Sequence, residues 1–123
     1  MYGVYVNEDG GIRYAMAIVQ SLKPVETRSR NTLKQIVGER VAIIRTKRNK
    51  EPMVVGYADI VRWEFCPYCL FEMYRADTLI PPGSKYDCTN KGKYFYWLEN
   101  AEPCTPYPLP KDRINHGRAY TEF

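Results

Sequence analysis

Three ionisable side chains lie close together in the sequence, at Lys23, Glu26 and Arg28. Successive side chains of an extended chain point to opposite faces, so Glu26 and Arg28 are expected on one face, with Arg30 beside them. Thr27 is expected on the opposite face. Cations on both sides favour the ionised form of a carboxylate, which suits an orienting or hydrogen-bonding role better than that of a general acid. The alternative is an exposed ion pair at a strand edge, which contributes about 0–1 kcal/mol.

A helix followed by a strand must position these side chains. Apolar residues recur at every fourth position of the segment Ile12–Leu22, and this spacing predicts a helix. Pro24 disfavours a helical conformation at Lys23, so the helix is expected to end near Ser21–Leu22. The segment Val25–Arg30 is predicted to be extended. Lys23 would then lie at the helix exit, close enough to lean over the same face as Glu26.

The rest of the chain predicts an α+β fold, a small β-barrel with one or two peripheral helices. A short helix is expected at Cys69–Ala76 and a loop at Ile80–Lys93. The segment Pro103–Pro110 contains four prolines and is predicted to follow the surface without ladder pairing. Short strands, the second and third of them forming a hairpin, are predicted at Tyr2–Val6, Val41–Ile44, Met53–Val61, Tyr94–Leu98 and Ala119–Phe123.

Length and composition indicate one globular domain, residues 1–123. Of the 123 residues, 45% are hydrophobic and 26% are charged, which argues against disorder. No apolar run reaches the length of about 18 residues that a membrane span needs. The first six residues carry no basic region and no long apolar stretch, so no signal peptide is expected. These features predict a cytoplasmic protein with reduced cysteines and no contact with membranes.

The positive charge is concentrated in one part of the chain. The net charge is +4, and the segment Lys23–Lys50 has nine basic residues against two acidic ones. That segment therefore carries +7 and the remainder −3. Such an asymmetry can attract a polyanion such as RNA, or it can be a solvated basic rim that only aids solubility.

The segment Tyr14–Ile18 followed by Lys23–Ser29 resembles the signature of the ASCH family, a branch of the PUA-like superfamily. In that signature an aromatic-led helix precedes Gly-x-Lys-x-x-Glu-x-Arg; here Ser21 stands at the place of the glycine. The similarity covers nearly the whole chain, and the departure near its end is Ala119-Tyr120, where the family often has an aromatic pair with Trp. Further segments that resemble the family are Gly38–Ile43, Val55–Ala58, Tyr94–Asn100, Pro106–Pro108 and His116–Arg118.

The resemblance implies a cleft lined by the Lys23–Arg28 segment that binds RNA or a nucleotide-like ligand, with no cofactor. Some family members are hydrolases that deacylate modified cytidine, and ribonuclease activity is attributed to others. The deacylases use a lysine with a threonine three positions later, where this chain has Glu26. That mechanism is therefore disfavoured. If the protein is nevertheless an amidohydrolase or nuclease, Lys23 would be the activating or charge-stabilising group and Glu26 would orient water.

Two aromatic side chains complete the predicted ligand-binding set. In the strand Tyr94–Leu98, alternation places Phe95 and Trp97 on the core face. Tyr94 and Tyr96 then face the other way, where they could stack on bases or pack in the interior. The predicted ligand-binding residues are Lys23, Glu26, Arg28, Arg30, Tyr94 and Tyr96.

The four cysteines allow three interpretations. Cys66 and Cys69 have the spacing of a glutaredoxin-like dithiol, but they follow no strand–helix–strand order of that fold. Together with Cys88 and Cys104 they could bind zinc, although structural zinc sites usually contain two close pairs and only one exists here. Plain reduced thiols are the favoured reading, so no metal is expected. His116 is the only histidine, which leaves no second histidine for a catalytic or metal triad.

Overall fold

The computed structural model describes residues 1–8, 10–115 and 117–123. The described residues form one six-stranded mixed sheet in the order β2-β5-β4-β3-β1-β6, with one main helix. The predicted α+β class is therefore confirmed. None of the helices in these three segments is long and apolar enough to cross a membrane. The elements are β1 (Tyr2–Asn7), α1 (Tyr14–Val19), β2 (Val25–Arg28), η1 (Lys34–Ile36), β3 (Arg40–Thr46), β4 (Met53–Cys66), η2 (Tyr68–Tyr74), α2 (Arg75–Thr78), β5 (Lys93–Pro108), η3 (Lys111–Arg113) and β6 (Tyr120–Glu122).

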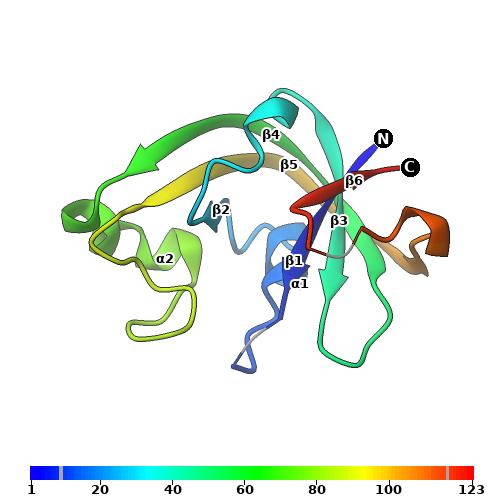
Figure 1. Ribbon diagram of the computed structural model, residues 1–123, viewed down its shortest axis with the longest axis horizontal. Coiled ribbons are helices and arrows are strands. Elements are labelled where there is room, and N and C mark those ends of the chain that lie inside the picture. Colours follow the sequence, from blue (N-terminus) through cyan, green and yellow to red (C-terminus); the bar gives the residue numbers. More distant parts are fainter. Residues whose placement is uncertain (9, 116) are drawn as a thin grey trace.

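The two longest strands, β4 and β5, arch across the molecule as an antiparallel pair, with α1 beneath the arch (Figure 1). Three register shifts interrupt this pair, and such irregularities bend a strand. Strand β1 runs parallel to β3 and antiparallel to β6, which places the two chain ends side by side. The pairings of the described strands leave β2 and β6 at the two ends of the sheet order, so a closed barrel stays a prediction.

Helix α1 packs against the concave side of the sheet and fixes the start of the site. Its buried side chains include Ala15, Ile18 and Val19. At Gly56 in β4 the helix approaches so closely that a Cβ would lie 2.5 Å from Val19 Cγ1 and would also meet the Glu102 carbonyl oxygen. Only glycine fits there, so this contact sets how near α1 comes to the sheet.

Helix α1 is shorter than the predicted Ile12–Leu22 because the backbone turns left-handed at Ser21, where φ is 62°. The Ser21 amide donates to the Ile18 carbonyl at 3.0 Å, and the Leu22 amide donates to the Ala17 carbonyl at 2.8 Å. This pair of hydrogen bonds is the Schellman arrangement, whose left-handed residue is usually glycine. Leu22 is 62% exposed and not part of the apolar helix face.

The prediction that Pro103–Pro110 runs without ladder pairing is wrong. Strand β5 continues to Pro108 and pairs with β4, with Pro103 opposite Gly56 and Pro108 opposite Met53. Strand β2 pairs only with Tyr94–Trp97, so the remainder of β5 is an outer edge. A residue without an N–H is tolerated on such an edge because that side of the strand needs no donor.

Other predicted elements agree with the structure. The hairpin of the second and third predicted strands is present as β3 and β4, and a last short strand is present as β6. The predicted helix at Cys69–Ala76 corresponds to the 3₁₀ segment η2 followed by the single turn α2. Strand β2 ends at Arg28, two residues before the predicted end of the extended segment.

Candidate functional site

A cavity of about 180 Å³ opens at the free edge of β2, between β1, α1 and the loop that follows α2. Pockets that enclose drug-sized ligands measure about 300–1,000 Å³, so this one suits a single small group such as a base, a ribose or a phosphate. Tyrosines from three elements form part of its wall. The charged residues of the lining are Lys23, Glu26, Arg28 and Lys93.

Lys23 is held inside the protein, with only 1% of its surface exposed. Its ammonium donates to the carbonyl oxygens of Val25 at 2.8 Å and Thr78 at 2.6 Å. It also lies 3.7 Å from Glu26 Oε1 and 5.2 Å from the centre of the Tyr14 ring. Burial lowers the pKa of Lys23, and the Glu26 carboxylate opposes that shift. The ammonium thus ties β2 to α2 and faces Glu26.

Glu26 and Arg28 form an ion pair along β2, as the alternation of an extended strand predicts. Arg28 Nη2 donates to Glu26 Oε2 at 2.9 Å and to the Tyr5 carbonyl at 2.6 Å. The other oxygen of Glu26 accepts the Thr27 backbone amide at 3.1 Å. The carboxylate is therefore fixed between two cations and a backbone donor, which suits it to hold Arg28 in one orientation.

Thr27 was expected on the face opposite Glu26, yet it also contributes to the cavity lining. The reason is the position of β2 at the end of the sheet. A cavity at a free strand edge meets atoms from both faces of that strand.

Lys93, at the start of β5, is the charged lining residue that the sequence predictions missed. It is 8% exposed, and burial lowers its pKa. A signal for it exists in the sequence: alternation puts Lys93 in phase with Phe95 and Trp97, which were assigned to the core. Phe95 is indeed fully buried, and Trp97 is half-buried with its Nε1 donating to Glu64 at 2.7 Å. A lysine in phase with core aromatics indicates a buried cation.

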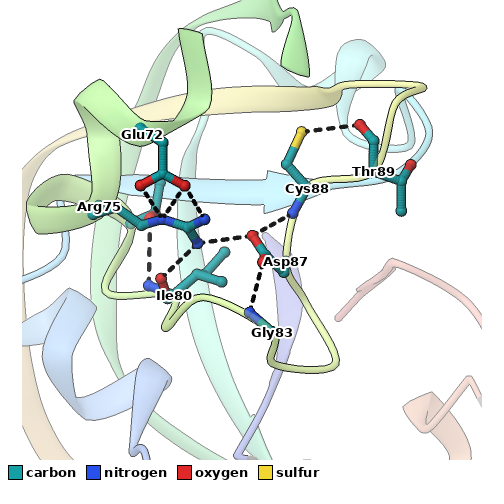
Figure 2. A network of polar contacts seen from close by, with 8 residues as sticks. Glu72, Arg75, Ile80, Gly83, Asp87, Cys88 and Thr89 are labelled. Carbon is teal, nitrogen blue, oxygen red and sulfur yellow. Dashed lines mark hydrogen bonds and ion pairs between the residues drawn. The ribbon is translucent and has the colours of Figure 1, made fainter. Parts of the chain in front are cut away.

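The outer wall of the cavity depends on Arg75. Figure 2 shows its guanidinium between Glu72 and Asp87, with Nη1 donating to the Ile80 carbonyl at 3.0 Å. The Asp87 carboxylate in turn accepts the backbone amides of Gly83 at 2.7 Å and Cys88 at 2.8 Å. This network closes the loop after α2, which contributes two residues to the lining.

Three predicted ligand-binding residues lie outside the cavity lining. Arg30 follows the end of β2 and is exposed. Tyr96 is fully buried, and its hydroxyl donates to Asn31 Oδ1 at 2.7 Å and accepts the Leu33 amide at 3.2 Å. Tyr94 packs against Trp63 and Phe65 on β4. Arg30 lies outside the cavity because β2 already ends at Arg28. Tyr94 and Tyr96 lie in the part of β5 that is flanked by β2 and β4.

The cysteines are dispersed. Cys66 lies opposite Lys93 at one end of the β4–β5 pair, whereas Cys104 lies on the order of 30 Å further along β5. Within the three described segments no group of three or more His, Cys, Asp or Glu side chains is placed to hold a metal. Burial raises the pKa of Cys66 to about 11, whereas a redox dithiol needs a lowered thiol pKa. Cys69 is exposed, and His116 lies outside the described residues.

The basic segment divides among several places. Arg40 is bound to Asp59 and Glu102 at the surface. The C-terminal part of the basic segment lines a second, larger and open cavity, which we call the basic groove. Consecutive residues at the end of β1 line the two cavities, Asn7 the first and Glu8 the second. The cations of the basic groove are Arg13, Arg45, Lys47, Arg48 and Lys50.

The fold and the cavity at its edge define a small α+β domain with a cationic site, and comparison with solved structures identifies the fold as that of ASCH proteins. A crystal structure of ASCH from Zymomonas mobilis matches 98% of this chain and 87% of that chain, with a TM-score of 0.75 and 19% identity. Structures of two variants of that protein match equally broadly. The tyrosine-to-phenylalanine variant covers 98% and 89% of the two chains (TM-score 0.74, 18% identity), and the serine-to-alanine variant 98% and 87% (0.70, 20%). No family model and no curated protein matches the sequence. The resemblance seen in the Lys23–Ser29 segment is thus confirmed for the fold.

Proposed function

We propose that this protein binds RNA or a nucleotide-like ligand, with one group of a nucleotide unit seated in the cavity at the edge of β2. The observation that carries the proposal is the convergence of Lys23, Glu26, Arg28 and Lys93 on one small cavity of an ASCH-like fold. Three cations against one carboxylate leave a surplus of positive charge. Glu26 holds Arg28 in place, and a carboxylate so fixed can also accept a hydrogen bond from a base or a ribose.

The basic groove supports a polymeric ligand. Glu8 lies between Arg13 at 3.8 Å and Lys47 at 3.7 Å, so two of the groove cations share one acid. Among the described residues Arg48 and Lys50 have no ion pair, and both are exposed. A strand that places a nucleotide in the cavity can therefore continue along the groove and exchange its counterions for these side chains.

The test is the binding of a short fluorescent single-stranded RNA, measured by anisotropy over a range of salt concentrations. We expect log affinity to fall linearly with log salt, by about 0.7 per neutralised phosphate. The double variant Arg48→Met/Lys50→Met should bind more weakly with a shallower salt slope. The control Lys34→Met/Arg62→Met removes two exposed cations that line neither cavity, and it should bind like the wild type. The proposal would be contradicted if the RNA affinity did not change with salt concentration, or if both double variants lost the same amount of affinity.

A second candidate is hydrolysis of RNA or of a modified nucleoside in the same cavity. The observation in its favour is that burial lowers the pKa of both Lys23 and Lys93, since such shifts cluster at catalytic sites. The test is turnover of acylated cytidines and of short RNAs by the wild type and by Glu26→Gln. Product formation that Glu26→Gln abolishes would establish an enzyme, and binding without turnover would leave the binding function alone.

A further inference from the structure

Lys93 combines burial with the lack of a partner. It is 8% exposed, and no hydrogen bond or ion pair joins its ammonium to any residue of the described segments. The ammonium nitrogen keeps some solvent exposure, because it is not one of the fully buried side-chain atoms that lack a hydrogen-bond partner. Lys93 is one of the residues that line the cavity. A charged group in this position keeps its donors available for something that enters.

Arg28 has unused donors in the same cavity. Only its Nη2 is hydrogen-bonded, to Glu26 and to the Tyr5 carbonyl. Its Nε is fully buried without a partner, whereas Nη1 is neither hydrogen-bonded nor fully buried and keeps its two donors for a ligand. Lys23 differs from both, since two of its three donors are bound to carbonyl oxygens and its third side faces Glu26. The donors left over in the cavity thus belong to Arg28 and Lys93.

The charge balance defines what would fill the space. Glu26 is the single acid of the lining and is already shared by Lys23 and Arg28. Glu26 and Asp87 attract Lys93 only through space, without an ion pair. Partly buried cations that lack a direct counter-charge are unfavourable, because the lost hydration is not repaid by a partner. An entering anion would relieve this imbalance, whereas a neutral ligand would make it worse by excluding the remaining water.

We propose that Arg28 and Lys93 form an anion subsite that takes the phosphate of the ligand, so that the protein selects nucleotides or a phosphorylated RNA end over neutral nucleosides. This inference rests on the proposed function and specifies its substrate class. Phosphate oxygens accept charge-assisted hydrogen bonds from guanidinium and ammonium groups. The cavity volume, about 180 Å³, suits a single group such as a phosphate, with the rest of the nucleotide outside the cavity.

The experiment compares the affinities of four nucleosides, their 5′-monophosphates and inorganic phosphate by calorimetry at constant ionic strength. We expect each monophosphate to bind at least tenfold more tightly than its nucleoside. Lys93→Met should weaken monophosphate binding ten- to a hundredfold, as for the loss of one charge-assisted hydrogen bond, without affecting the nucleosides. Lys91→Met is the matched control, because Lys91 is exposed two residues earlier and does not line the cavity. Lys93→Arg, which keeps the charge, should recover part of the affinity.

The outcomes separate this inference from the proposed function. If nucleosides and monophosphates bind the wild-type protein equally well, the protein is a nucleoside or nucleotide binder and the anion subsite is refuted. The subsite is refuted as well if Lys93→Met, shown to be folded by urea denaturation, binds monophosphates like the wild type. If inorganic phosphate binds through Lys93 while no nucleotide or RNA binds better than phosphate alone, the subsite is supported and the proposed function is refuted.

Discussion

Replacing Lys23 by methionine tests whether this lysine is chiefly a structural support of the site. Methionine keeps the length of the side chain and removes the ammonium, so the carbonyl oxygens of Val25 and Thr78 lose their donor. Each buried acceptor left without a partner costs about 1–3 kcal/mol, which gives about 2–6 kcal/mol for two. Removal of a buried charge offsets part of this cost, because burial already disfavours the charged form of Lys23. We therefore expect Lys23→Met to lower the free energy of unfolding by about 2–4 kcal/mol.

The measurement is urea denaturation followed by tryptophan fluorescence. Unfolding should shift to lower urea while the slope stays the same, because a change in stability alone moves only the midpoint. The control is Lys34→Met, an exposed lysine whose ammonium lies 5.9 Å from the centre of the Trp63 ring. It should stay within about 0.5 kcal/mol of the wild type.

Two results would refute the reasoning. If Lys23→Met is as stable as its control, the two carbonyl contacts contribute nothing to the fold. If it is as stable as the wild type but no longer binds RNA, the lysine acts on the ligand and its structural role is secondary. A loss of stability together with near-normal affinity at temperatures where the variant is folded would confirm the support role.

Three further predictions concern a backbone position, a thiol and a titration. Ser21→Gly should raise the free energy of unfolding by about 0.5–1 kcal/mol, because φ at Ser21 is 62° and glycine adopts this left-handed region without strain. The control Ser29→Gly, at a position without a positive φ, should lower the free energy of unfolding in the same urea assay. At pH 8 alkylation mapped by mass spectrometry should label exposed Cys69 well before Cys66, whose pKa is about 11 and whose thiolate fraction is then about 0.1%; equal labelling rates would contradict this. Burial lowers the pKa of Lys93 below the value of about 10.4 for an unfolded chain, so between the two values the unfolded state binds more protons. Urea denaturation should accordingly show the wild type gaining stability relative to Lys93→Met as pH rises from 7 to 10, and a constant difference would argue against a buried ammonium.

Local patterns in the sequence predicted the part of the site that a single segment builds. Glu26 and Arg28 share a face because β2 is extended, and Lys23 lies between the end of α1 and β2, where its ammonium reaches Glu26 as expected. The helix itself ends earlier than Pro24 predicts, at the left-handed turn of Ser21. Ser21, which stands at the place of the glycine in the ASCH signature, has a left-handed backbone conformation, the conformation that glycine adopts most readily.

What the sequence could not supply is the position of this segment in the sheet. The faces of β2 follow from alternation, but its free edge follows from the strand order, which depends on pairing with β5. That edge explains why Thr27 lines the cavity despite its predicted face. The same pairing explains the prolines of β5, because β2 covers only the first part of that strand and leaves the rest as an edge.

The site combines two different uses of a buried cation. Lys23 is bound to backbone carbonyls and to Glu26, so its charge stabilises the junction between α1 and β2 and contributes little donor capacity to the cavity. Lys93 lacks such partners, and Arg28 has only part of its donors occupied. A fold selected for stability alone would gain by replacing an unpartnered buried lysine with an apolar residue in phase with Phe95 and Trp97. The lysine at this position therefore argues for a ligand that supplies the missing negative charge.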